Sequence, residues 1–212
     1  MPSVKRSYDA SRRQQLARES RLRVLDAARA RLLRDGYAAT TIAQIAADAN
    51  VAPKTVAKQF GTKPGLVKAL FDVALVGDDD GGSLEERDPI IAIHDEPDPH
   101  RKLQRYADAL ATMLPRTGPI QLLLREASGD AELTKVWSGI KAGRLAGMTN
   151  LANNLAAGGH LRADMTVDEA SDILWTYSSP ELYELLVHER GWTASRYAEF
   201  ITTGTSAALL PD

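Results

Sequence analysis

Cations and hydrogen-bonding side chains gather on one short segment of the chain, between Pro53 and Phe60. Val56 and Phe60 are four residues apart, so a helix here would bury both on a single stripe. That leaves four polar side chains for the outer face: Lys54, Thr55, Lys58 and Gln59. A short helix with such a face suits the major groove of DNA, where lysine pairs with guanine and glutamine with adenine. We therefore expect base contacts from Lys54, Thr55 and Gln59, although simple solvation is an equal alternative for Lys54.

A second short helix is predicted just before this segment, joined to it by a tight turn. The pair Thr40-Thr41 offers a hydroxyl N-cap at its start. Apolar side chains then recur on one helical face: Ile42, Ile45 and Ala46. Asn50 in the turn is one of the few residue types besides glycine that tolerate a left-handed conformation. Pro53 suits the first position of the second helix, so residues 41–60 are predicted to form a helix-turn-helix motif.

Two further residues are placed to bind DNA phosphates. Thr41 lies at the start of the first motif helix, where its hydroxyl and free backbone N–H groups can bond a phosphate oxygen. Lys63 opens the next predicted helix, and the helix dipole there also favours an anion. Phosphate contacts of this kind set affinity and register, whereas contacts to base edges set sequence preference.

The distribution of charge supports a nucleic-acid partner. The whole chain is almost neutral, with a net charge of −2. Residues 1–75, however, hold 14 Lys and Arg against six Asp and Glu, which gives +8, whereas residues 76–212 hold 12 against 22, which gives −10. A basic N-terminal third joined to an acidic remainder indicates a module that faces DNA, fused to a part with another role.

The hydrophobic pattern predicts an all-α fold of about nine helices. Residues 1–12 are polar and predicted to be a disordered basic arm. Residues 13–62 form the predicted DNA-binding domain. Residues 63–212 form a larger helical bundle for ligand binding and dimerisation, interrupted by a loop over residues 77–98, where the isoleucines at 90, 91 and 93 are expected to dock on the core.

Three interruptions shape the predicted bundle. The first helix after the loop is predicted to end at Arg116-Thr117-Gly118-Pro119, with a short buried helix after it. A helix over residues 168–189 is predicted to bend at Pro180. Gly139, Gly143 and Gly147 form a bare ridge that either permits close helix approach or leaves space for a ligand.

Composition excludes several other classes of protein. The chain has no cysteine, so disulfides, thiolate metal sites and cysteine nucleophiles are excluded. Its N-terminus has no apolar signal region, and no run approaches the ~18 apolar residues of a membrane span. These features are typical of a cytoplasmic protein without a membrane partner, and no residue pattern indicates a cofactor.

At this point the chain resembles the TetR/AcrR bacterial transcriptional regulators. The resemblance covers residues 15 to 72 and is carried by a signature with consistent spacing: Ala27-Ala28, Gly36-Tyr37, Thr40-Thr41, Ile45-Ala46, Val51, Thr55-Val56, Phe60, Lys63 and Leu66. A looser likeness to the last two helices of one subgroup is carried by Leu174-Trp175-Thr176, Ser179-Pro180-Glu181, Glu189-Arg190-Gly191-Trp192 and Tyr197.

The resemblance implies a three-helix DNA-binding head, a ligand-binding body and a homodimer held by the last two helices. It also implies repression that a small molecule relieves. Asn50 replaces the family's usual glycine, and Ala52 replaces its usual Ser or Thr cap. Ala57 replaces a phosphate-binding tyrosine, so Lys58 is our candidate substitute, and Lys63 matches the family's phosphate-binding lysine.

The expected partners are a near-palindromic duplex operator, a second copy of the chain and a small apolar or aromatic effector. The dimer surface is expected on residues 167–189 and 194–209, from Leu182, Leu185, Leu186, Phe200 and Ile201. The effector pocket is expected among Met113, Leu123, Trp137, Met148, Trp175 and Tyr177, because methionine and aromatic side chains suit an adaptable apolar site. All of these residues can also be ordinary core.

Two other functions compete with a ligand-released repressor. One is a related regulator that activates transcription or responds to no ligand. The other is a helical metal-dependent enzyme that uses acidic residues, with Glu184 and His188 on one helix face at metal-ligand spacing. An exposed ion pair explains Glu184 and His188 more simply, because no second histidine motif accompanies them.

Overall fold

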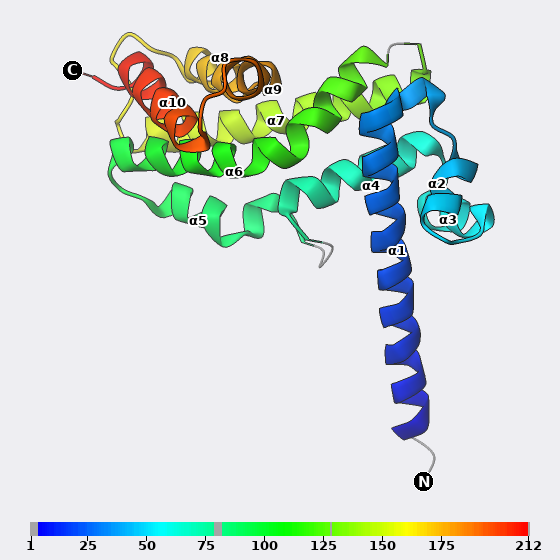
Figure 1. The fold of residues 1–212 in the computed structure, drawn as a ribbon. Helices are drawn as coiled ribbons and strands as arrows, with labels where there is room; N and C mark the ends of the chain where they lie inside the picture. The colour runs from blue at the N-terminus through cyan, green and yellow to red at the C-terminus, as the bar shows by residue number, and fades with distance from the viewer. Residues whose placement is uncertain (1–3, 79–81, 128, 212) are drawn as a thin grey trace. The chain divides into compact units, whose positions relative to one another are not determined.

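The computed structural model describes residues 4–78, 82–127 and 129–211, and for residues 4–11, 13 and 14 it describes the backbone alone. Within these ranges every regular element is a helix (Figure 1), which confirms the predicted all-α fold. The helices gather into two compact units, residues 1–73 and residues 74–212. Most of helix α4 (Lys63–Val76) therefore belongs to the first unit, whereas the sequence placed all of it in the second.

The first unit also contains α1 (Val4–Ala39), α2 (Ile42–Asp48) and α3 (Pro53–Phe60). Residues 4–12 are helical where the sequence predicted a disordered arm, because neither glycine nor proline interrupts the chain from Val4 to Asp35. Residues 1–3 of that arm lie outside the described residues. Helical geometry breaks at Gly36, whose φ of 79° is a left-handed value that glycine adopts without strain.

Apolar side chains from all four helices form the core of this unit. The most buried of them are Val24, Leu25, Ala28, Leu32, Ile45, Ala46, Val56, Leu66 and Val67. They follow helical spacing on each element, so each helix presents one apolar stripe to the others. Burial of these stripes fixes which faces of α2 and α3 remain exposed.

The second unit is built around two long helices, α6 (Pro99–Glu126) and α7 (Ala131–Ala157), which run side by side in Figure 1. Helix α10 (Ala194–Leu209) packs mainly on α6, and α8 (Val167–Tyr177) packs mainly on α7. The remaining elements are η1 (Leu84–Glu86), α5 (Asp88–Asp95), α9 (Pro180–Tyr183) and a π-helical segment η2 (Glu184–Glu189). One apolar core joins α5, α6, α7, α8 and α10.

The predicted loop over residues 77–98 contains η1 and α5 instead. Ile93 is buried and Ile90 packs on the core as expected, whereas Ile91 is exposed. The C-terminal carbonyls of α5 are satisfied by a residue from another helix: buried Lys102 of α6 donates to the carbonyl oxygens of Ile93 and His94 at 3.1 and 2.8 Å. A cation at this end also interacts favourably with the helix dipole. Because Lys102 belongs to a different helix, the sequence around α5 does not predict this cap.

Two other predicted interruptions differ in the structure. Helix α6 runs through both Pro115 and Pro119 without ending, because side chains on both sides of the prolines are buried: Leu114, Thr117, Ile120 and Leu124. Pro180 does not bend one long helix but begins a new one, at the first position of α9 after an N-cap hydroxyl from Ser179. At Gly118, α6 approaches α9 closely, since an added Cβ would lie 3.8 Å from Pro180.

None of the described helices is both long enough and apolar enough to cross a membrane.

Candidate nucleic-acid interface and ligand cavities

The turn between α2 and α3 is closed by a Schellman motif. Val51 donates its N–H to the carbonyl of Ala46 at 2.9 Å, and Asn50 donates to Ala47 at 3.1 Å. This pattern needs a left-handed residue just after the helix, and Asn50 has a φ of 53°. The predicted left-handed turn at Asn50 is therefore confirmed. Its rigidity fixes the angle at which α3 leaves α2.

The start of α2 is fixed by a capping box. The Thr41 hydroxyl oxygen accepts from the N–H of Gln44, and the side-chain oxygen of Gln44 accepts from the N–H and the hydroxyl of Thr41. Thr41 is exposed, so it can face a phosphate, but its hydroxyl hydrogen already has an acceptor in Gln44. Sequence reasoning missed Gln44, although its position three residues after a threonine is a recognisable signal.

Helix α3 begins at Pro53 without a side-chain cap, because Ala52 in the N-cap position has no hydroxyl. Val56 is fully buried. Phe60 is half-buried, and the Arg21 guanidinium of α1 lies 4.8 Å from the centre of its ring. The buried stripe expected from the spacing of these two residues is therefore present, and it turns the opposite face of α3 outward.

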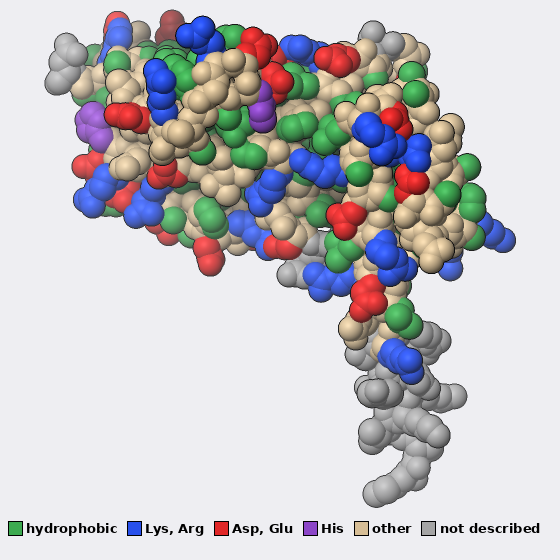
Figure 2. All heavy atoms as spheres, in the orientation of Figure 1, with side chains coloured by type: hydrophobic (Ala, Val, Ile, Leu, Met, Phe, Trp, Pro, Cys, Tyr) green, Lys and Arg blue, Asp and Glu red, His purple; other side chains and the backbone are tan. Residues whose placement is uncertain are grey.

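The outward face of α3 holds the predicted DNA-binding residues. Lys54 and Lys58 are exposed, as is Ala57 between them, and Thr55 is half-buried. Gln59 differs: its amide oxygen is buried, and no hydrogen-bond donor of the described chain reaches it. Glutamine binds adenine through both its amide oxygen and its amide N–H. The Gln59 side chain must therefore turn before its buried oxygen can contact a base. Figure 2 shows Lys and Arg side chains spread over this unit and the described part of α1.

Lys63 binds the end of α1. Its ammonium donates to the carbonyl oxygen of Tyr37 and lies 3.8 Å from the centre of the Tyr37 ring. An ammonium has three N–H donors, so a phosphate contact is compatible with this bond. The structure therefore gives Lys63 a positioning role that the sequence did not predict.

A second brace joins α1 to α2. Arg31 donates from Nε and Nη2 to the two carboxylate oxygens of Asp48, at 2.6 and 2.9 Å. This bidentate pair lowers the pKa of Asp48, chiefly through the hydrogen bonds. Asp48 is the last residue of α2, where the helix dipole disfavours a carboxylate, so Arg31 compensates an unfavourable position. Arg31 carries no local signal that distinguishes it from the other arginines of α1.

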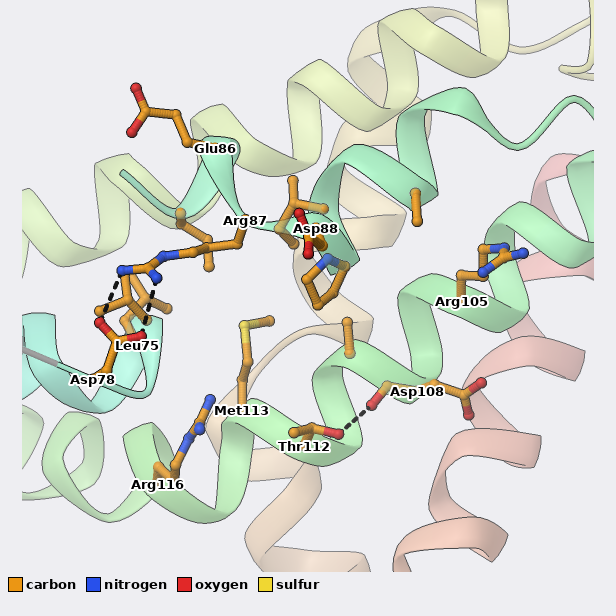
Figure 3. Close-up of a pocket in the computed structure, with 16 residues that line it drawn as sticks. Leu75, Asp78, Glu86, Arg87, Asp88, Arg105, Asp108, Thr112, Met113 and Arg116 are labelled. Atoms are coloured by element: carbon orange, nitrogen blue, oxygen red, sulfur yellow. Dashed lines mark hydrogen bonds and ion pairs between the residues drawn. The ribbon is translucent and has the colours of Figure 1, made fainter. Parts of the chain in front are cut away.

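The second unit holds a cavity of about 600 Å³ between the end of α4, η1, α5 and α6 (Figure 3). Apolar groups from all of these elements meet polar ones there. Leu75, Val76, Ile90 and Met113 contribute hydrocarbon surface, and Arg87 pairs with both oxygens of Asp78 at 3.0 Å. The site thus combines an apolar wall with fixed charges, which is the usual composition of a small-molecule pocket.

The structure does not bring the six predicted pocket residues into one site. Met113 lines the cavity at α4, whereas Trp137 and Trp175 line a separate cleft between α6, α7, α8 and α9. Met148 and Tyr177 pack against the core, and Tyr106 donates its hydroxyl to the Met148 sulfur at 3.3 Å. Leu123 is half-buried and lines neither cavity. The three ridge glycines of α7 face open space within the described chain.

The five predicted dimer residues also divide. Leu185 of η2 and Phe200 of α10 are exposed by 48% and 38%, unusually high for such large apolar side chains. Leu182 and Leu186 are half-buried against the core. Ile201 is fully buried within its own chain, so it cannot contact a partner and is removed from the predicted surface.

The pair proposed for metal chemistry lies on the surface. His188 Nε2 and Glu184 Oε2 are 3.9 Å apart, and both side chains are about half exposed. Among the described residues, no group of three or more His, Asp and Glu side chains is arranged to hold a metal ion. Three consecutive aspartates, Asp78 to Asp80, are a further acidic cluster of the sequence; Asp78 pairs with Arg87, and the other two lie outside the described residues.

Sequence comparison shows what the first unit is similar to. The family model described as bacterial regulatory proteins, tetR family, matches residues 24–70, which include all of α2, the turn and α3. A curated relative, the uncharacterized HTH-type transcriptional regulator YvkB of Bacillus subtilis (strain 168), is 47% identical over 54 residues. That match covers 26% of this chain and 29% of the relative, so it spans less than a third of the relative's length.

The whole fold is similar to those of solved regulators. NalD of Pseudomonas aeruginosa, the secondary repressor of a multidrug efflux pump, has a TM-score of 0.72 at 21% identity, covering 92% of this chain and 98% of that one. FadR of Bacillus subtilis, solved with stearoyl-CoA, has a TM-score of 0.70 at 18% identity, covering 87% and 96%. A Saccharomonospora viridis protein solved with choline has a TM-score of 0.67 at 16% identity, covering 92% and 99%.

At these identities the solved structures establish the fold, and the match at residues 24–70 shows that the first unit is similar to the tetR-family regulatory proteins. Residues 24–70 are therefore similar to the bacterial regulatory proteins of the tetR family, and the described chain has the all-helical fold of the solved regulators.

Proposed function

We propose that the protein is a dimeric repressor that binds a near-palindromic operator and is released from it by a small molecule. The observation that supports this most directly concerns helix α4. Its first residue, Lys63, binds Tyr37 of the DNA-binding unit, and its last two residues, Leu75 and Val76, line the cavity of the second unit. A ligand in the cavity would therefore contact the same helix whose first residue binds Tyr37 of the DNA-binding unit.

On DNA, the exposed face of α3 lies in the major groove. Lys54, Thr55 and Gln59 contact base edges, and Gln59 must first turn its buried amide oxygen outward. Phosphates are bound by three further residues: Thr41, Lys58 and Lys63. Ala57 is exposed but has no polar group to bind a phosphate. Lys58 therefore supplies the phosphate contact that position 57 cannot make.

One head buries too little surface for tight and specific binding, so two heads act together. Leu185 and Phe200 form the centre of the proposed dimer surface, and Trp192 extends it, since its ring packs edge-on against Phe200 with centroids 5.6 Å apart. Two copies related by a twofold axis would place their recognition helices in successive major grooves, about 34–36 Å apart.

Release follows from a two-state equilibrium. The effector must bind the state that cannot hold DNA more tightly than the state that can, because otherwise the equilibrium does not shift. A cavity of about 600 Å³ matches a drug-sized molecule, and its walls suit an apolar or aromatic body with a polar group. Proteins of similar fold are solved with ligands as different as stearoyl-CoA and choline, so the fold does not select the effector.

The test of this function compares two substitutions on α6. Thr112 is exposed and lines the cavity, so Thr112→Trp adds bulk there without crowding the core. Gln104 is exposed on the same helix but outside the cavity, so Gln104→Trp is the matched control. A compound panel is first screened for release of the wild-type protein from a duplex selected out of random DNA.

We expect Thr112→Trp to abolish release by the active compounds and Gln104→Trp to preserve it. Equal release of both variants would place the effector elsewhere. Failure of every compound to change DNA affinity would contradict a ligand-released repressor, and transcription assays on the selected operator separate repression from activation.

A further inference from the structure

A second cleft in the body has features that the proposed regulatory cycle does not use. It has a volume of about 390 Å³ and lies between α6, α7, α8 and α9. Trp137, Lys141 and Arg144 of α7 share one helix face at spacings of four and three residues. The remaining lining residues are Arg125, Trp175, Thr176, Ser179 and Glu181. We call this site the tryptophan cleft.

Two hydrogen-bond donors in the tryptophan cleft have no acceptor. Within the described part of the chain, no acceptor reaches Nε of Arg144 or Nε1 of Trp175, and both atoms are buried. Buried N–H groups are nearly always paired, because an unpaired one loses its bond to water and gains nothing. Two such donors from side chains that touch each other therefore point to a ligand that supplies the acceptor.

The protein fixes both donors in position. Arg144 donates through Nη1 to the carbonyl oxygen of Trp175 at 2.6 Å and to Oγ of Ser178 at 2.8 Å. Its guanidinium also lies 4.6 Å from the centre of the Trp175 ring. These contacts use one edge of the guanidinium and leave Nε without a bond. A preorganised donor set of this kind costs a ligand little ordering on binding.

The charge of the tryptophan cleft favours an anion. Arg125 and Glu181 neutralise each other through an ion pair at 2.7 Å. Arg144 and Lys141 remain, and the Lys141 ammonium lies 5.5 Å from the centre of the Trp137 ring. Burial lowers the pKa of Arg144, because the guanidinium has lost part of its hydration. A bound anion would compensate for this loss.

We propose that the tryptophan cleft binds a planar aromatic carboxylate. Its carboxylate accepts from Arg144 Nε and Trp175 Nε1, and its ring packs on the indole surfaces of Trp137 and Trp175. Because both donor atoms are closed to solvent in the free chain, a rim side chain must turn aside first, and Lys141 and Arg125 are long enough to do so. This site is separate from the cavity at α4, and its test does not involve DNA.

The probe is naphthoate, and naphthamide is its uncharged counterpart of equal shape. Each is titrated into isotope-labelled full-length protein while the indole N–H resonances of the three tryptophans are followed by NMR. We expect the Trp175 resonance to move downfield with naphthoate, and naphthoate to bind at least about tenfold more tightly than naphthamide, because charge-assisted hydrogen bonds are stronger.

Two substitutions test the donors of the cleft. Trp175→Phe keeps the aromatic ring and removes the donor, so naphthoate affinity should fall about tenfold. Arg144→Lys keeps the charge but removes Nε, and should also weaken binding. Its matched control is Arg101→Lys, because Arg101 is an exposed residue of α6 outside the cleft, and this variant should bind naphthoate like the wild type. If Arg144→Lys unfolds, the result for Trp175→Phe still tests the proposal.

Equal affinity for the acid and the amide would overturn the proposal. It would also be overturned if Trp175→Phe bound naphthoate like the wild type, or if no tryptophan resonance moved at millimolar probe. The proposed repressor function would survive each of these results, since its effector cavity lies at α4.

Discussion

Lys63 and Tyr37, 26 residues apart, meet where α4 begins and α1 ends: the lysine ammonium donates to the tyrosine carbonyl and lies 3.8 Å from the tyrosine ring. This contact ties the helix that enters the body to the helix that supports the recognition motif. Lys63 therefore has two roles in our account, as a brace within the head and as a phosphate contact.

The two roles of Lys63 predict a combined effect of Lys63→Ala. DNA affinity should fall for all sequences, and the slope of binding against salt should fall by about one. Thermal stability should fall as well, by about 1 kcal/mol, because a half-buried carbonyl loses its charged donor. Lys54→Ala is the control: it should change base preference without changing the melting temperature. Lower stability with unchanged DNA affinity would leave Lys63 only its bracing role.

Gly65 permits the close approach of α4 to the end of α3. A Cβ at this position would clash with the carbonyl oxygen of Phe60, so Gly65→Ala should destabilise the protein by about 1–3 kcal/mol. Gly139 of α7 faces open space, so Gly139→Ala should stabilise it by about 0.5–1 kcal/mol through helix propensity. Urea denaturation measures both, and equal effects would contradict the packing described at Phe60.

The Arg31–Asp48 brace predicts acid sensitivity of the head. The pKa of Asp48 is lower in the folded state than in the unfolded state, so its contribution is complete above the unfolded pKa. That contribution is lost as pH falls through the folded pKa, below about pH 4. Asp48→Asn should therefore flatten the acid limb of a plot of stability against pH. Arg31→Met should do the same, and an unchanged limb in both variants would remove the brace from our account.

The exposed side chain of Leu185 predicts the oligomeric state. Leu185→Glu places a charge at the centre of the proposed dimer surface and should yield a monomer with much weaker operator binding. Leu145 is similarly exposed, at 39%, but lies on α7, so Leu145→Glu should remain dimeric. Light scattering at matched concentrations distinguishes the variants, and a dimer that persists in Leu185→Glu would move the interface elsewhere.

Interactions between residues close in sequence made much of the first unit predictable. The hydroxyl of Thr41, the left-handed tolerance of Asn50 and the N1 preference of Pro53 each act within a few residues, so the sequence was sufficient to place α2, the turn and α3. The brace of Arg31 on Asp48 was not predictable, because it joins residues 17 positions apart and needs the packing of α1 on α2.

Tertiary burial decided what the sequence could not. Pro119 predicts a helix end, yet α6 continues because Ile120 and Leu124 beyond it are buried. Helix α5 is held by Lys102 from another helix. The predicted pocket residues share only their apolar or aromatic type, and packing separates Met113 from Trp137 and Trp175. Arg144 has no sequence signal that marks it as a binding residue, and only its surroundings, which leave Nε without an acceptor, make it one.

The central claim is that α3 reads duplex DNA in two copies, and selection of bound duplexes from random sequence tests it most directly. At moderate ionic strength we predict a near-palindrome with half-site centres about one helical turn apart, and a changed preferred base for Gln59→Ala. A monomeric protein that retains all duplexes equally well would contradict the claim.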